Sequence, residues 1–244
     1  MPWDFALILL FFATAVPLLG RRRVRQLMRM EKTTKADRLT LYASTILFQW
    51  AAAALILWRT TVHGILPSSL GVAIPNPALS CAVLVVLTGL VLANQLVSLR
   101  RLALRPSEAH GIVPQLALKI FPQDNAERLA FFAVVVTVSL CEEFIFRGFA
   151  QRVFQDASGG SVLVGVLSSA LLFGIEHAYQ GRPGLVATSV VGIIFGAVRS
   201  WTGSLLAVVV AHFAADLAAG FLAPSKLRAA GTISDTPATG TGTH

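Results

Sequence analysis

Apolar runs of bilayer length are the feature that most constrains how this chain folds. Seven such runs occur, at residues 3–19, 39–58, 78–99, 129–154, 162–179, 185–199 and 205–222. About 20 apolar residues suffice for a helix to cross a membrane. Helices also satisfy every backbone polar group internally, which lipid requires. The sequence therefore predicts an all-α, polytopic transmembrane helical bundle of about seven spans.

The amino-acid composition agrees with a membrane protein. Of the 244 residues, 55% are hydrophobic and 13% are charged, and the mean hydropathy is +0.70. An ordinary soluble domain carries about 25% charged residues. This shortage argues against a water-soluble globule, and the high apolar content argues against an intrinsically disordered chain.

The formal charge of +8 is concentrated in one place. Eight of the 20 Lys and Arg residues lie between Arg21 and Arg38, directly after the first run. Basic residues beside a span are typical of a cytoplasmic loop, and no basic–aromatic stripe suggests nucleic-acid binding. With this loop inside, counting spans sends Arg147 and Arg152 outward. Either that count is right, or one segment is miscounted or re-entrant.

The runs divide the chain into three regions. Residues 1–126 contain three spans and the basic loops, residues 127–223 contain four spans, and residues 224–244 read as a disordered tail. A short interfacial helix is expected at 115–121.

Small residues within the spans suggest packing roles. Cys81 and Cys141 are expected to be small buried hydrophobes, with neither a disulfide nor a zinc–thiolate site. Gly192 and Gly196 form a G-x-x-x-G pattern, which we interpret as close helix packing rather than dimerisation.

Ionisable residues inside the later spans are the candidates for function. An unpaired charge in the bilayer interior costs about 2.5–3.5 kcal/mol on insertion scales, so such residues are functional candidates by default. Three clusters qualify, and they comprise Glu142, Glu143 and Arg147, then Glu176 and His177, then His212 and Asp216.

Helix geometry predicts different roles for the two adjacent glutamates. Glu143 and Arg147 are four residues apart and can pair on one helix face. Glu142 is rotated by about 100° from Glu143 and stays free for chemistry. Taken alone, this cluster could equally be an interhelical salt-bridge network that fixes packing.

The spacing of His212 and Asp216 places both on one helix face. Asp216 could set the tautomer of His212, act as a second metal ligand, or orient a substrate carbonyl. A His–Asp pair that serves packing alone is the alternative. Adjacent helix residues point in different directions, so Glu176 is expected to face away from whatever His177 faces.

Together the clusters predict one buried polar pocket that contains Glu142, His177, His212 and Asp216. A carboxylate and two imidazoles can hold a zinc-type ion with an open position for water. Without a metal, Glu142 can act as general base on a water while His212 stabilises the oxyanion. Both routes lead to amide hydrolysis inside the membrane.

The three clusters resemble the signature of the CPBP family, the CAAX-protease and bacteriocin-processing enzymes of the Abi type. That signature is E-E-x-x-x-R, then F-x-x-x-H, then H-x-x-x-N or H-x-x-x-D, on successive transmembrane helices. It is matched here by Glu142-Glu143 to Arg147, Phe173 to His177, and His212 to Asp216. The resemblance covers about residues 127 to 222 and implies an intramembrane endopeptidase.

The resemblance also implies a role for each matching residue. Glu142 and His177 would activate water, and His212 with Asp216 would bind a metal or the oxyanion, so all four are candidate catalytic residues and candidate metal ligands. Asp216 stands where many relatives have Asn. An acid is the better metal ligand, which mildly favours zinc as cofactor over a metal-free glutamate mechanism.

The expected surroundings follow from the same resemblance. They are a bacterial inner membrane, crossed several times, and a substrate that is a membrane-associated protein or peptide, prenylated or not. Two other functions stay open at this point. One is a non-catalytic membrane scaffold or bacteriocin-immunity protein. The other is a proton-coupled transporter, which buried Glu and His residues also suit although no inverted repeat is visible.

Overall fold

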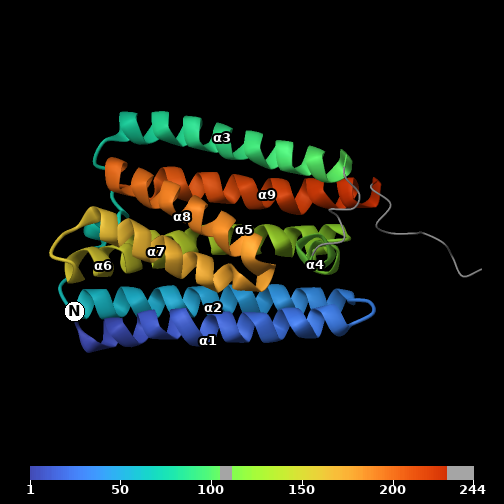
Figure 1. The fold of residues 1–244 in the computed structure, drawn as a ribbon, viewed down its shortest axis with the longest axis horizontal. Coiled ribbons are helices and arrows are strands. Elements are labelled where there is room, and N and C mark those ends of the chain that lie inside the picture. Colours follow the sequence, from blue (N-terminus) through green and yellow to red (C-terminus); the bar gives the residue numbers. More distant parts are fainter. Residues whose placement is uncertain (105–111, 230–244) are drawn as a thin grey trace, which may run out of the picture.

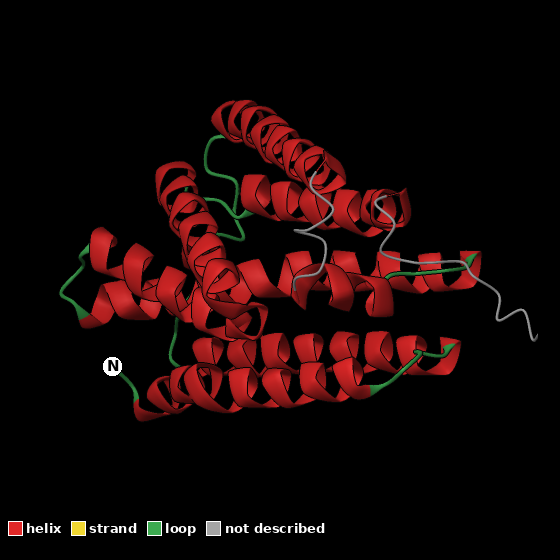
Figure 2. Ribbon diagram, turned by 45° about the vertical axis from the view of Figure 1, so that its right-hand side comes forward, coloured by secondary structure: helices red, strands yellow, loops and turns green. Residues whose placement is uncertain are grey.

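The fold is a helical bundle, as the sequence predicts. The computed structural model describes residues 1–104 and 112–229, and every regular element in these ranges is a helix (Figure 2). The longer helices are α1 (Trp3–Arg29), α2 (Lys35–Val62), α3 (Pro77–Leu104), α5 (Asn125–Glu143), α7 (Val162–Glu176), α8 (Gly181–Thr202) and α9 (Leu206–Ala229). The shorter ones are η1 (Pro67–Leu70), α4 (Ile112–Ile120), the π-helix η3 (Phe144–Ala150), α6 (Gln151–Ala157) and the 3-10 helix η4 (His177–Gln180).

The long helices lie side by side, so the bundle has two ends (Figure 1). The end formed by residues 21–38 and 112–128 is called the basic end here, and it lies at the right of Figure 1. The opposite end contains the N-terminus, the connection between α2 and α3, and the turns that precede α7 and α9. Helix α4 confirms the short helix expected near 115–121.

Five segments are long and apolar enough to cross a membrane: Trp3–Arg29, Lys35–Val62, Pro77–Arg101, Asn125–Ala157 and Val162–Thr202, with Leu206–Leu222 a shorter apolar helix. The chain is an integral membrane protein.

The segment Val162–Thr202 folds back on itself as α7, η4 and α8 (Figure 1). Gly174 approaches Ser189, and Gly192 approaches Ala170, which is the pattern of an antiparallel hairpin. Counting both arms of this hairpin, the fold agrees with about seven spans.

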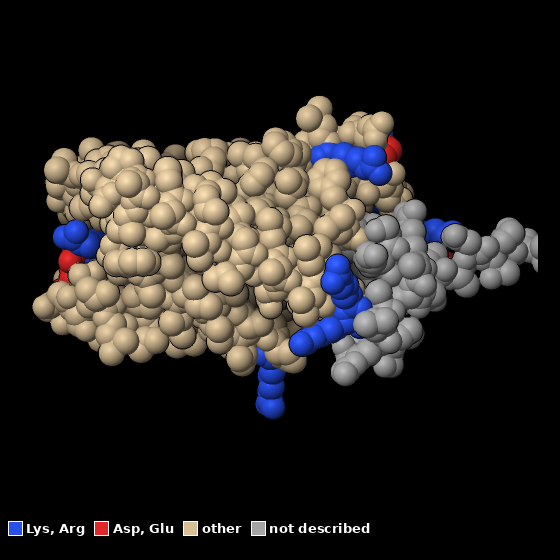
Figure 3. All heavy atoms as spheres, turned by 90° about the horizontal axis from the view of Figure 1, so that it is seen from above, with Lys and Arg blue, Asp and Glu red and all other residues tan. Residues whose placement is uncertain are grey.

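The arginines at the opposite end have partners within the chain. Arg59 Nε lies 2.7 Å from Asp4 Oδ2, Arg152 Nε lies 2.7 Å from Asp156 Oδ2, and Arg199 Nη2 donates to the backbone oxygen of Ser69 at 2.6 Å. Far more Lys and Arg residues gather at the basic end, and a broad surface without charged residues separates the two ends (Figure 3). This bias predicts that the basic end faces the cytoplasm.

Two apolar cores connect the N-terminal spans to the rest of the bundle. One joins Phe12 of α1 and Ile56 of α2 to Phe146 and Phe173, and the other joins α3 to α8 and α9. Cys141 is buried in the first core as expected, but Cys81 is exposed. It lies on α3, whose outer face is suited to contact lipid, and there a thiol needs no protein around it.

Small residues make the close helix contacts. Gly192 packs against Ala170, and Gly196 packs against Val166 and Gln151, so the G-x-x-x-G pattern serves packing within the chain. Helix α9 continues through Pro224 to Ala229, and residues 224–229 of the expected tail are therefore helical. The remainder of that tail, 230–244, lies outside the described residues.

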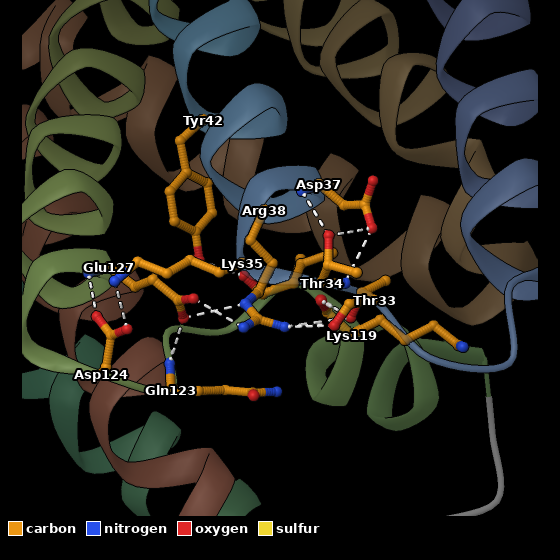
Figure 4. Close-up of polar contacts among 11 residues, drawn as sticks. Thr33, Thr34, Lys35, Asp37, Arg38, Tyr42, Lys119, Gln123, Asp124 and Glu127 are labelled. Atoms are coloured by element: carbon orange, nitrogen blue, oxygen red, sulfur yellow. Dashed lines mark hydrogen bonds and ion pairs between the residues drawn. The ribbon is translucent and has the colours of Figure 1, made fainter.

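A polar network at the basic end joins the starts of α2 and α5 (Figure 4). Arg38 donates to both carboxylate oxygens of Glu127, at 3.0 and 2.7 Å, and both side chains are buried. Asp124 caps α5, and its hydrogen bond from the Lys35 ammonium lowers the pKa of the Asp124 carboxyl. The network fixes α2 beside the helix that carries the first candidate cluster.

Candidate active site

Glu143 and Arg147 form a buried ion pair near the middle of the bundle. Arg147 Nη1 donates to Glu143 Oε1 at 3.1 Å, and both side chains are fully buried, which confirms the predicted pairing. The Arg147 guanidinium also lies 4.1 Å from the ring centroid of Phe173, a cation–π contact. The chain changes to a π-helix at Phe144, which the sequence did not predict. Such turns are rare and frequently occur at functional sites.

Glu143 also contacts the third cluster. His212 Nδ1 lies 2.8 Å from Glu143 Oε1, and His212 Nε2 lies 3.5 Å from Asp216 Oδ2. An ionised carboxylate only accepts hydrogen bonds, so Nδ1 is the donor to Glu143. The Asp216 side chain is 41% exposed whereas that of Glu143 is 0% exposed. The polar cluster therefore opens toward its surroundings at Asp216.

The tautomer of His177 is set by the backbone. His177 Nδ1 lies 2.9 Å from the carbonyl oxygen of Phe173, which can only accept. Nδ1 therefore carries the hydrogen, and in the neutral ring Nε2 keeps a lone pair. The ring also packs against the Phe173 side chain, with 4.5 Å between ring centroids.

Glu142 has one carboxylate oxygen bonded and one free. Gln49 Nε2 of α2 donates to Glu142 Oε1 at 3.0 Å. The other oxygen, Oε2, is buried and has no hydrogen-bond partner within the described part of the chain. As the helix geometry predicted, Glu143 rather than Glu142 pairs with Arg147.

The structure brings the four predicted catalytic side chains into one neighbourhood. Glu142 interacts electrostatically with His212 and Asp216, and so does His177. These residues come from α5, η4 and α9. The 2.8 Å contact of His212 with Glu143 and the packing of Phe173 against both His177 and His212 place the three clusters next to one another. The catalytic roles of these residues stay a prediction.

Two residues of this neighbourhood were not predicted. Gln49 lies far from the motifs in sequence, although a carboxamide within an apolar run was a usable signal. Glu176 was expected to face away from whatever His177 faces, with no role in the pocket, and it interacts electrostatically with Glu142. The α-helix ends at Glu176 and the tighter η4 begins at His177, so regular α-helical spacing does not hold between these two residues.

Unpartnered polar atoms are concentrated at this site. The described residues contain ten buried side-chain nitrogen or oxygen atoms without a hydrogen-bond partner, and five of them are Gln49 Oε1, Glu142 Oε2, Glu143 Oε2, Arg147 Nη2 and Glu176 Oε1. Buried polar atoms are nearly always paired in native proteins. Their concentration here indicates a place where water or a polar ligand binds.

The arrangement gives no direct support to the predicted zinc site. His212 Nε2 and Asp216 Oδ2 face each other, but the described residues contain no group of three or more His, Cys, Asp or Glu side chains that could hold a metal ion. A catalytic zinc is normally held by three protein ligands. We write the proposed reaction with side chains and water, and zinc stays a prediction.

A comparison with protein families matches residues 124–218 to the Rce1-like family, described as type II CAAX prenyl endopeptidase Rce1-like. The matched segment contains all three motifs, from Glu142 to Asp216. No curated protein and no solved structure matches the chain. The family match confirms the resemblance carried by the motifs.

Proposed function

We propose that this chain, whose residues 124–218 match the Rce1-like family, is an intramembrane endopeptidase that uses Glu142 to activate water. The observation that carries the proposal is the buried, unpartnered Oε2 of Glu142, a residue that interacts electrostatically with His212. A carboxylate oxygen that is buried and free is suited to take a proton from a bound water.

Two acceptors are available for that water. Glu142 Oε2 is free, and His177 Nε2 keeps a lone pair because Nδ1 donates to Phe173. A water that donates one hydrogen to each would have its oxygen lone pairs free. As that oxygen attacks the scissile carbonyl carbon, Glu142 takes one proton and a tetrahedral intermediate with an oxyanion forms.

His212 is suited to stabilise the oxyanion. Glu143 holds its Nδ1–H, while the 3.5 Å contact from Nε2 to Asp216 is long enough to be exchanged. Both ring nitrogens of His212 face carboxylates, so the proposed ring is the imidazolium, which carries an N–H on each nitrogen. Its Nε2–H can therefore exchange Asp216 for the developing negative charge. The intermediate collapses when the C–N bond breaks and the leaving amine takes the proton from Glu142, which gives one carboxylic acid and one amine.

The proposed substrate is a membrane-associated protein or peptide in a bacterial inner membrane. Asp216 forms the open side of the site, and the cytoplasmic orientation of the basic end follows from the positive-inside rule. Peptides with a prenylated CAAX end are the first class to try, because the family description names that chemistry.

The test uses the full chain in detergent with a quenched fluorescent farnesylated CAAX peptide. Glu142→Gln and His177→Ala are each expected to lower turnover by about 10²–10⁴-fold, the usual contribution of a general base. Asp156→Asn is the matched control, since it makes the same change of acid to amide at a surface pair with Arg152. It should cleave like the wild type.

Retention of wild-type turnover by both site variants would refute the proposal. A Glu142→Gln protein that cleaves nothing yet sustains the cellular role of the wild type would instead support a scaffold. Uptake into proteoliposomes that depends on a pH gradient would support a transporter.

A further inference from the structure

We propose that Gln49 of α2 is a positioning residue that orients the carboxylate of Glu142 for catalysis. The inference rests on the function proposed above and extends it to a residue outside the matched segment 124–218. Gln49 Nε2 holds Glu142 Oε1 at 3.0 Å, which directs Oε2 to the water.

The carboxamide of Gln49 is committed to Glu142. Gln49 is buried, and its Nε2 donates to Glu142, while its Oε1 has no hydrogen-bond partner among the described residues. If Gln49 served packing alone, its buried Oε1 would lower the stability of the fold without a compensating contact. An apolar side chain of the same size would fill the space without leaving a buried acceptor unsatisfied. The hydrogen bond to Glu142 is the feature that explains a carboxamide at this position.

Other groups around Glu142 are poor substitutes for this donor. Its electrostatic neighbours come from three parts of the chain: Glu143 and Arg147 on its own helix and π-turn, His212 and Asp216 on α9, and Glu176 at the end of α7 with Tyr179 in η4. Arg147 and His212 both bind Glu143, and three of the remaining groups are carboxyls. Gln49 is the neutral donor that reaches Glu142 from a different helix.

The position of α2 beside α5 does not depend on Gln49. At the basic end Arg38 binds Glu127 through two hydrogen bonds (Figure 4). Next to Gln49, Trp50 Nε1 donates to Thr137 Oγ1 of α5 at 3.2 Å. Because these contacts hold the two helices together, loss of the Gln49 amide should change the orientation of Glu142 and leave the packing of the helices intact.

The orientation of a catalytic group has a large effect on rate. A misplacement of about 1 Å can lower the rate by about 10²-fold. A Glu side chain without its hydrogen bond rotates more freely, so fewer molecules hold Oε2 where the water binds. This loss affects the chemical step rather than the binding of substrate.

The decisive variant is Gln49→Met, which keeps the length of the side chain and removes its N–H donor. We expect kcat to fall by about 10- to 100-fold, in line with the effect of misplacement, while KM stays unchanged. Gln49→Glu, which replaces the donor by an acceptor, should lower kcat further. Trp50→Phe is the matched control, because it removes the neighbouring α2–α5 hydrogen bond without touching Glu142, and its kcat should stay at the wild-type value.

Thermal unfolding in detergent separates positioning from a merely structural role. Gln49→Met should unfold at a midpoint no lower than that of Trp50→Phe, although only the former loses kcat. Wild-type kcat in Gln49→Met would overturn the inference. It would also be overturned if kcat fell in both Gln49→Met and Trp50→Phe, in each case in proportion to the loss of thermal stability.

Failure of this inference is distinguishable from failure of the proposed function. Full turnover by Glu142→Gln would refute the proposed function, whereas an inactive Glu142→Gln beside a fully active Gln49→Met would refute the inference alone. An infrared measurement needs no turnover. The infrared band of the Glu142 carboxylate is identified as the one that disappears in Glu142→Gln. This band should shift in Gln49→Met and stay in place in Trp50→Phe. An unshifted band in Gln49→Met would overturn the inference.

Discussion

Glu143 Oε1 lies 2.8 Å from His212 Nδ1, so the second glutamate of the adjacent pair, not the first, holds the histidine of α9. The same oxygen accepts from Arg147 Nη1 at 3.1 Å. Glu143 thus joins α5, the π-turn and α9 through one buried carboxylate. Glu142, one residue earlier, is left with a free oxygen. The two neighbouring glutamates therefore have different surroundings, and the proposed function gives Glu143 a task in stability and Glu142 a task in chemistry.

This division predicts opposite responses to the same substitution. Glu143→Gln leaves the buried Arg147 without its ion pair and should lower the free energy of unfolding by about 3–5 kcal/mol, the usual effect of breaking a buried pair. Glu142→Gln should change it by less than about 1 kcal/mol, because this variant keeps the size of the side chain. Unfolding curves in detergent measure both, and equal stability of the two variants would contradict the assignment.

Gly148 follows Arg147 directly, and its lack of a side chain lets η1 approach the π-turn. A Cβ at this position would lie 2.9 Å from the backbone oxygen of Leu70. Backbone moves less readily than a side chain, so Gly148→Ala should destabilise the protein by about 1–3 kcal/mol. Gly89→Ala on α3 is the control, since a Cβ there meets nothing within 4 Å. If both variants show the wild-type unfolding midpoint, the close approach has no effect on stability.

Local spacing predicted the contacts that lie within one helix. The four-residue spacing of Glu143 and Arg147 predicted their ion pair, and that of His212 and Asp216 predicted a shared face. These predictions succeed because helix geometry alone fixes which side chains meet. The convergence of the clusters followed from the high free energy of isolated charges in lipid.

Contacts between distant helices could not be read from the sequence. Gln49 and Glu142 are 93 residues apart, and their contact depends on how α2 packs against α5. The π-turn depends on the packing around Arg147, and the position of Glu176 depends on the change from α-helix to η4. Each of these features is set by tertiary packing, which periodicity does not encode.

The buried pair of Arg38 and Glu127 gives a prediction about helix docking. Their side chains are 5% and 1% exposed, so removal of either partner leaves an uncompensated charge and should lower the free energy of unfolding by about 3–5 kcal/mol. The double variant Arg38→Met with Glu127→Met should be more stable than either single variant, because it leaves no unpaired charge. A double-mutant cycle on unfolding free energies tests this. Strictly additive losses would show that the two side chains do not stabilise the protein as a pair.

Asp216 provides the sharpest test of the role of the last motif. In the metal-free reaction its task is to accept a hydrogen bond from His212 Nε2, which lies 3.5 Å from Asp216 Oδ2. An asparagine carbonyl accepts in the same way, so Asp216→Asn should keep turnover within about tenfold of the wild type, whereas Asp216→Leu, which has no acceptor, should lose more.

As a zinc ligand, by contrast, Asp216 would need its negative charge, since an amide is a weak ligand for that ion. Dialysis against a chelator should accordingly leave the turnover of both wild type and Asp216→Asn intact. Loss of activity on dialysis, with recovery on addition of zinc, would show that the site accepts a metal when functional and that Asp216 serves it.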